Sequence, residues 1–128
     1  MLLLLIDDDE DDRELFQLAV EDASVRVECI TIKSGYEALT MLSQRAIRPD
    51  FIFLDLNMPE MDGRECLAEL KKSMHLKGIP VVIFSTSSDP RDVKETRELG
   101  AVHFISKPSQ IQDLTESVDS FLITQTTK

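Results

Sequence analysis

Five short apolar runs alternate along the chain with longer segments in which apolar residues recur every three or four positions. Short apolar runs are typical of strands buried in a sheet, whereas the three-to-four periodicity predicts amphipathic helices. The expected strands cover residues 2–6, 25–32, 51–55, 81–84 and 102–106. A segment with helical periodicity follows each of them, so the pattern is strand then helix, five times.

Capping residues set the expected helix starts. A polar N-cap is followed by an acidic residue three positions on, or by proline, in three cases: Ser34 with Glu37, Asp62 with Glu65, and Asp89 with Pro90. Gly100 lies just past the fourth helix. The first helix is expected over residues 10–22 and the last to open at Ser109. The expected buried faces are Leu15, Leu18, Ala19 and Ala23 in the first helix, Cys66, Leu67, Leu70 and Met74 in the third, and Ile111, Leu114, Val118, Phe121 and Leu122 in the last.

This alternation predicts a doubly wound α/β fold. Its five-stranded parallel sheet has the order 2-1-3-4-5, with helices on both faces, a flavodoxin-like arrangement. A length of 128 residues suits one domain over residues 1–128, with residues 123–128 expected to form a frayed tail. The order places strands one and three side by side at the point where the chain reverses direction across the sheet.

Charged residues follow three of the expected strands, at ends that a parallel sheet brings to one edge. Asp7 and Asp8 follow the first strand, Asp55 closes the third, and Lys107 follows the fifth. Open α/β sheets bind ligands at this edge, where the strand order reverses. Two carboxylates about 5 Å apart repel by roughly 3 kcal/mol at an effective dielectric near 20. A hard divalent cation such as Mg²⁺ would relieve that repulsion.

Charge and composition exclude several partners. A formal net charge of -10 argues against direct nucleic-acid binding, because phosphate contacts need clustered lysine and arginine. The opening apolar run has no basic flank and is shorter than a signal-peptide core, and no other segment approaches a membrane span. Cys29 and Cys66 have no paired spacing. We therefore expect a cytoplasmic protein with reduced thiols that does not bind a membrane.

Four segments together resemble the receiver domain of two-component response regulators. They are residues 5–9 (LIDDD), 53–63 (FLDLNMPEMDG), 82–86 (VIFST) and 104–108 (FISKP), in the right order and over nearly the whole chain. The resemblance implies a phosphoryl-accepting signalling switch rather than a turnover enzyme. By position it implies Asp55 as phosphoryl acceptor, Asp7, Asp8, Asp55 and the Asn57 backbone carbonyl as Mg²⁺ ligands, Ser85 as the hydroxyl that meets the phosphoryl group, Lys107 as its counter-charge, and Phe104 as the switch aromatic.

The resemblance also implies partners. A histidine kinase or a phosphotransfer protein would donate the phosphoryl group. Because no output domain follows the last helix, we expect a stand-alone receiver. Its output would be a protein target or a homodimer, through the face made by the fourth helix, fifth strand and fifth helix. A cis peptide bond is implied between Lys107 and Pro108.

Other interpretations use the same acids. A haloacid-dehalogenase-like phosphatase would pair Asp7 with Asp9, but that family expects Thr or Val where Asp11 stands and is usually much longer. A calcium loop that starts at Asp7 would need Gly where Asp12 stands and Glu where Leu18 stands.

Several polar residues have expected structural roles. Asp9 is expected to cap the first helix and Asp12 to lie on the surface. His75 and His103 are expected at the surface or at a strand edge, since neither has ligand spacing around it.

Overall fold

A strand forms at each expected apolar run, and a helix follows every strand. The computed structural model describes residues 1–126. Its elements are β1 (Leu2–Ile6), α1 (Glu10–Glu21), β2 (Glu28–Ile32), α2 (Gly35–Ser43), β3 (Phe51–Leu54), α3 (Gly63–Lys72), β4 (Val81–Ser85), α4 (Pro90–Glu98), β5 (His103–Ser106) and α5 (Ile111–Thr126).

The sheet has the predicted order, β2-β1-β3-β4-β5, and every neighbouring pair is parallel. Ile6 of β1 pairs with Leu54 of β3, and Leu54 pairs with Ile83 of β4. β1 and β3 therefore end level with each other, whereas β4 continues beyond Ile83 to Ser85. This register brings the residues that follow β1 and β3 to the same edge of the sheet.

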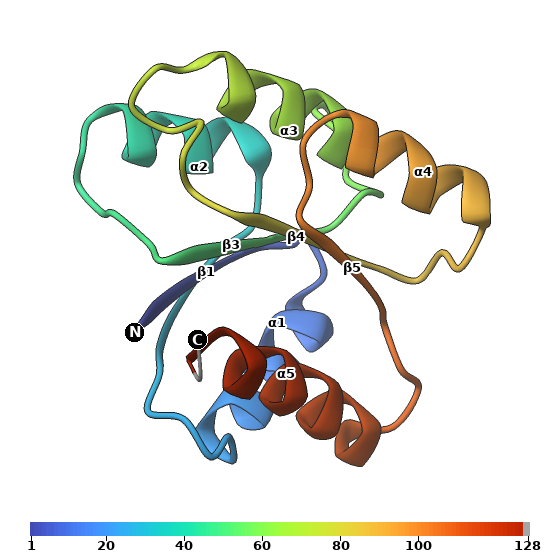
Figure 1. Cartoon of the computed structure of the whole chain (residues 1–128). Helices are drawn as coiled ribbons and strands as arrows, with labels where there is room; N and C mark the ends of the chain where they lie inside the picture. The colour runs from blue at the N-terminus through green and yellow to red at the C-terminus, as the bar shows by residue number, and fades with distance from the viewer. Residues whose placement is uncertain (127–128) are drawn as a thin grey trace.

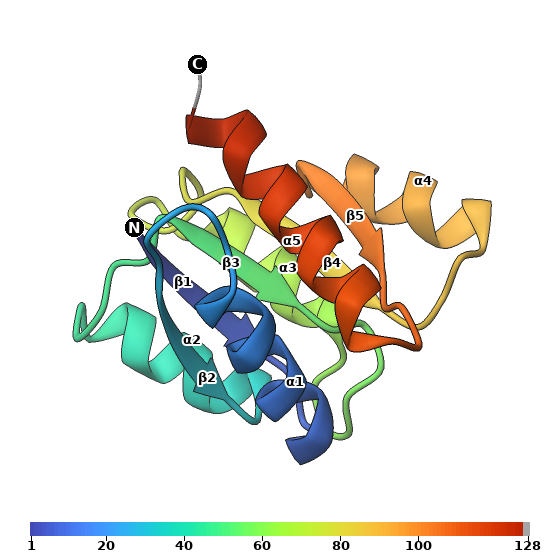
Figure 2. The same ribbon diagram turned by 90° about the horizontal axis from the view of Figure 1, so that it is seen from below.

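Two helical layers enclose the sheet, as Figure 1 shows. α2, α3 and α4 cover one face, whereas α1 and α5 lie side by side on the other (Figures 1 and 2). Because neighbouring residues of a strand point to opposite faces, β3 sends Ile52 and Leu54 into the first layer and Phe53 into the second. The ring of Phe16 in α1 packs on those of Phe53 and Phe84, with centroids 5.1 Å and 5.4 Å away.

The predicted caps are confirmed. The carboxylates of Asp9, Asp62 and Asp89 and the hydroxyl of Ser34 each accept a hydrogen bond from a backbone N–H in the first turn of their helix. Such caps stabilise a helix by about 1 kcal/mol each. Gly100 ends α4 with a φ of 112°, a backbone conformation that a residue with a side chain rarely adopts.

Two expected faces are wrong in part. α1 buries Phe16 and Val20 with Ala19, whereas Leu15 and Leu18 are 41% and 52% exposed. Two overlapping sets of residues had helical spacing, and the contacts of Phe16 with other aromatic rings decide which set is buried. Met74 lies past the end of α3 and is 79% exposed.

The remaining differences concern ends and turns. β2 begins only at Glu28, and α5 begins at Ile111, which is 41% exposed. Residues 123–126 are helical where a frayed tail was expected, and residues 127–128 lie outside the described part. None of the peptide bonds described is cis, so the cis bond before Pro108 is wrong. The trans isomer is preferred by about 1 kcal/mol before proline, and with it Lys107 still reaches the sheet edge.

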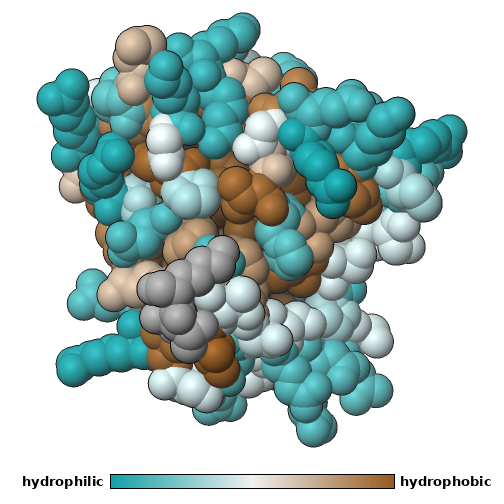
Figure 3. All heavy atoms as spheres, in the orientation of Figure 1, coloured by the Kyte–Doolittle hydropathy of each residue, from teal (hydrophilic) through white to brown (hydrophobic). Residues whose placement is uncertain are grey.

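Hydrophilic side chains cover most of the surface seen in Figure 3, and apolar atoms show mainly between the two helical layers. Within residues 1–126, no helix is both long enough and apolar enough to cross a membrane.

Candidate functional site

Three carboxylates meet at the carboxyl ends of β1 and β3. Asp7, Asp8 and Asp55 each offer one oxygen, and these oxygens all lie within 4.8 Å of one another. Asp7 and Asp55 are buried, whereas Asp8 is exposed to solvent. Three hard oxygen donors at this separation fit one divalent cation such as Mg²⁺, which prefers carboxylates together with water and phosphate oxygens.

Backbone contacts fix the two buried acids. The N–H of Asp55 donates to the carbonyl of Ile6 at 3.0 Å, which ties the end of β3 to β1. Asp7 Oδ1 accepts from the N–H of Asp9 at 3.0 Å, and the Asp7 carbonyl accepts from Arg13 Nη1 at 2.9 Å. The positions of both carboxylates are therefore set by the sheet and by the first turn of α1.

Asn57 follows β3 in the loop before α3. Its N–H donates to Asp55 Oδ1 at 3.4 Å, and the residue is exposed. This contact helps to orient the Asp55 carboxylate. The metal-binding role of the Asn57 carbonyl stays a prediction.

Lys107 reaches this cluster from the end of β5. Its Nζ donates to Asp7 Oδ2 at 2.7 Å and to Asp12 Oδ2 at 2.8 Å, and lies 3.4 Å from Asp55 Oδ2. The side chain is only 8% exposed, and its Nζ also lies 5.4 Å from the centre of the Phe84 ring. A buried positive charge therefore stands beside the buried acids.

The electrostatics of the site follow from this burial. Burial is the main cause that raises the pKa of Asp55 to about 6, with the charge of Asp7 adding to it and Lys107 opposing it. Burial also raises the pKa of Asp7, and the hydrogen bond from Lys107, which lowers this pKa, offsets only part of the rise. Burial alone would lower the pKa of Lys107, but its bonds to Asp12 and Asp7 outweigh that effect and raise it. The pocket thus holds more negative charge than its single lysine balances, which favours a cation.

Asp9 lies outside this cluster of acids. Its carboxylate accepts from the backbone N–H of Asp12 at 3.0 Å and caps α1, as expected. The phosphatase alternative needs Asp9 beside Asp7 as a reacting group, so the cap geometry disfavours it.

Ser85 ends β4 and is fully buried. Its Oγ accepts from the N–H of Ser87 at 3.3 Å, and the carbonyl of Ser85 accepts from the N–H of Lys107 at 2.6 Å. Ser85 is therefore joined both to the loop before α4 and to the residue that carries the buried ammonium.

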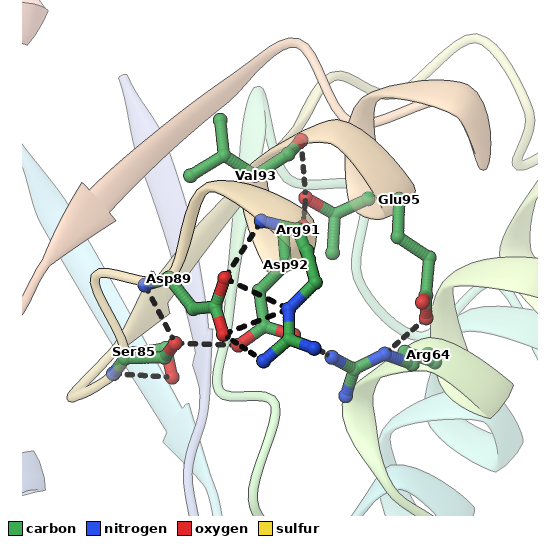
Figure 4. A network of polar contacts seen from close by, with 9 residues as sticks. Arg64, Ser85, Asp89, Arg91, Asp92, Val93 and Glu95 are labelled. Carbon is green, nitrogen blue, oxygen red and sulfur yellow. Dashed lines mark hydrogen bonds and ion pairs between the residues drawn. The ribbon is translucent and has the colours of Figure 1, made fainter.

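A polar network continues from this loop to two helices. The Ser87 hydroxyl donates to Asp92 of α4, and Arg64 of α3 bonds both Asp92 and Glu95. Figure 4 shows Arg64 reaching from α3 to the carboxylates of α4. Sequence reasoning missed Arg64 and Asp92, because their separation of 28 positions gives no local signal.

Phe104 is half-buried, lies opposite Ile83 of β4, and packs against the core beneath α2, α3 and α4. Of the histidines, His103 stacks on Phe121 at the expected strand edge, with ring centroids 5.1 Å apart. His75 departs from its expected surface role. Its Nε2 is buried and has no hydrogen-bond partner among the described residues.

Asp12 is the clearest difference at the site. Sequence reasoning placed it on the surface, yet it is half-buried and bonded to Lys107. The available signal was its place in the first turn of the helix after β1. That turn faces the same sheet edge as the strand ends.

A doubly wound sheet with an acidic cluster and a buried lysine at its switch point is the architecture of a receiver-type α/β domain. In agreement, the family model described as "Response regulator receiver domain" matches residues 3–119. The chain belongs to this family.

Known relatives agree with this assignment. Response regulator Rcp1 of Synechocystis sp. is 35% identical over 128 residues, which cover 94% of this chain and 87% of Rcp1. Among solved structures, the phosphorylated cyanobacterial phytochrome response regulator RcpA is 38% identical, with a TM-score of 0.85, over 94% of this chain and 89% of that one. The Mn²⁺-bound form of Rcp1 is 35% identical with a TM-score of 0.83, over 94% and 90%.

Proposed function

We propose that this chain accepts a phosphoryl group on Asp55 and acts as a switch in a two-component phosphorelay. The observation that carries the proposal is the setting of the Asp55 carboxylate. It is buried, lies 3.4 Å from the Lys107 ammonium, and shares a cluster with two other carboxylates. An acid in such a site can act as a nucleophile toward phosphorus while nearby positive charge stabilises the transition state.

The transfer itself needs little covalent chemistry from the protein. An oxygen of Asp55 attacks phosphorus, the new O–P bond forms as the N–P bond of a phosphohistidine breaks, and the imidazole leaves. Asp7, Asp8, Asp55 and the Asn57 carbonyl would hold Mg²⁺, which when bound neutralises charge on the phosphoryl oxygens. Lys107 supplies a second positive charge from a side chain that is already buried.

A phosphoryl group adds close to two negative charges and three acceptor oxygens. The Ser85 hydroxyl would turn toward it and give up its bond from the Ser87 N–H. Phe104, which packs opposite Ile83, would then move further into the core beside β4. The result is a changed surface on α4, β5 and α5, used for a protein target or a homodimer.

The expected donor is a histidine kinase or a phosphotransfer protein in the cytoplasm. One similar structure is named as a phytochrome response regulator and is phosphorylated, and another holds Mn²⁺. These relatives support the proposal that Asp55 is phosphorylated with the help of a divalent cation. They also make a phytochrome-type kinase a sensible first donor to test.

The test is direct labelling. Incubation with Mg²⁺ and acetyl phosphate should add one phosphoryl mass per chain, as measured by intact-protein mass spectrometry. Asp55→Asn should abolish the gain, whereas Asp11→Asn, which removes an exposed carboxylate from the same end of the molecule, should keep it. Equal labelling of Asp55→Asn and the parent protein would overturn the assignment.

A further inference from the structure

Lys107 donates hydrogen bonds to two aspartates, of which only one belongs to the carboxylate cluster. Asp7 belongs to the cluster that offers oxygens for a cation, but Asp12 does not. Asp12 lies in the first turn of α1, and its side chain is 32% exposed. Its Oδ2 is nevertheless 2.8 Å from Lys107 Nζ, closer than the 3.4 Å that separates Nζ from Asp55 Oδ2.

These distances show that the Lys107 ammonium rests nearer to Asp7 and Asp12 than to Asp55. An ammonium group has three N–H donors, and Lys107 directs hydrogen bonds to Asp7 and Asp12. Its approach to Asp55 is a longer ion pair, at 3.4 Å. A third donor remains for a phosphoryl group on Asp55, but the bonds to Asp7 and Asp12 hold the ammonium 3.4 Å from the Asp55 carboxylate, so a closer approach would loosen one of them.

We propose that Asp12 is a positioning residue that competes with the phosphoryl group on Asp55 for the Lys107 ammonium. This inference rests on the proposed function of Asp55 and specifies how its phosphorylated form is regulated. Asp12 holds Lys107 in the resting geometry and so limits the stability of the phosphorylated form. Without Asp12, the lysine meets the phosphoryl oxygens at lower cost.

A tether that held Lys107 in the correct position for the phosphoryl group would have the opposite effect. The distances favour competition, because Asp12 holds the ammonium more closely than Asp55 does. The ammonium would keep its bond to Asp7, at 2.7 Å in the buried pocket, when Asp12 is replaced. Loss of Asp12 therefore leaves a lysine that is still in place and more available.

The size of the effect lies between that of an exposed ion pair and that of a buried charged hydrogen bond. Loss of the Asp12 bond should strengthen binding of a phosphoryl analogue on the order of threefold to tenfold. Removing any nearby negative charge also favours an anion. The control is Asp11→Asn, which removes an exposed carboxylate from the same helical turn.

The experiment measures beryllofluoride binding at saturating Mg²⁺ by NMR titration. Asp12→Asn should lower the dissociation constant threefold to tenfold relative to Asp11→Asn. In a Lys107→Met background, Asp12→Asn should bind no more tightly than Asp11→Asn in the same background, because the specific action of Asp12 passes through the lysine. Thermal melting of each metal-free variant checks that it is folded.

Three results would overturn the inference alone. One is an Asp12→Asn affinity equal to that of Asp11→Asn, and another is an advantage of Asp12→Asn over Asp11→Asn that persists in the Lys107→Met background. Weaker binding in Asp12→Asn that Asp12→Glu restores would also overturn it and make Asp12 a tether that aids the site. A parent protein that neither binds beryllofluoride nor takes a phosphoryl group would instead remove the proposed function, and the inference with it.

Discussion

Gly63 lies directly against the backbone of Asp55. A Cβ at position 63 would stand 2.3 Å from the Asp55 carbonyl oxygen and 2.7 Å from the Cα of Leu56. The Gly63 N–H also donates to the Leu56 carbonyl at 2.9 Å. The first turn of α3 is therefore pressed onto the residues that end β3, and this contact helps to fix the place of Asp55.

Gly63→Ala should consequently destabilise the fold. Alanine at a helical position is favoured over glycine by up to about 1 kcal/mol. The new methyl group, however, clashes with backbone atoms, which cannot move away as the end of a flexible side chain could. Overpacking of this kind costs about 1 to 3 kcal/mol, so the net effect should be a loss of stability. Urea denaturation would measure it. Gly78→Ala is the matched control, because nothing lies within 4 Å of a Cβ there, and it should change stability little.

The stability of the metal-free protein should depend on the charge of Asp55. Its pKa is raised to about 6 from an ordinary value of 3.8, so the fold holds the protonated form more tightly than the unfolded chain does. This stabilisation is complete below about pH 4 and is lost as the pH rises through 6. Asp55→Asn carries no such charge and should be more stable than the parent at pH 7, by up to about 3 kcal/mol.

Urea denaturation at pH 4 and at pH 7, without metal, tests this prediction. The gap between Asp55→Asn and the parent should be near zero at pH 4 and largest at pH 7. Saturating Mg²⁺ should narrow it, because a ligand that binds only the folded parent stabilises it. A gap that closes at pH 7 would contradict the prediction. Asp11→Asn serves as the control and should show no gap of this shape.

The outline of this fold is readable in the sequence because each signal is local. A buried strand is a run of apolar residues, and a cap such as Ser34 acts on an N–H three residues away. The acids after β1 and β3 could also be brought together in advance, since a parallel sheet places strand ends at one edge. What could not be predicted depends on distant pairing. Asp12 became a partner of Lys107, 95 positions away, because the Lys107 side chain reaches the first turn of α1.

The buried face of α1 is a second feature that the sequence alone did not predict correctly. Leu15 and Leu18 have the same spacing as buried residues, but the sheet offers its aromatic surface to Phe16. Periodicity alone does not distinguish the two sets, because they differ by a small rotation of the helix.

The metal site gives a further prediction. Asp8 is the exposed member of the three-carboxylate cluster, and Asp8→Ala removes one hard oxygen donor. Loss of groups that merely orient metal ligands commonly lowers metal affinity by about 10- to 100-fold, so loss of a ligand should cost at least about tenfold. Asp9→Ala should weaken Mg²⁺ binding less, while costing about 1 kcal/mol of stability through its lost cap. Calorimetric titration with Mg²⁺ would compare them, and equal affinity of Asp8→Ala and the parent would count against the site.

The polar network beyond Ser85 suggests how the signal reaches α4. The Ser87 hydroxyl accepts from the N–H of Asp89 at 3.2 Å and donates to Asp92, which in turn binds Arg64 of α3. A movement of Ser85 toward a phosphoryl group releases the Ser87 N–H, so the position of Ser87 should change with the state of Asp55. Hydrogen-bond networks of this kind carry energetic coupling between sites.

Ser87→Ala removes the hydroxyl at the centre of this set and leaves the acidic cluster and Lys107 intact. Binding of beryllofluoride with Mg²⁺ should stay within about threefold of the parent, because the bonds described for the Ser87 hydroxyl go to Asp89 and Asp92 and not to the acidic cluster. The NMR shifts that this binding induces in residues 90–98 should fall to less than about half, since α4 loses its link to the loop after β4. Ser88→Ala, at an exposed neighbouring position, should keep the parent pattern. If both variants retain full shifts in α4, the signal leaves the site by another route, such as β5 and Phe104.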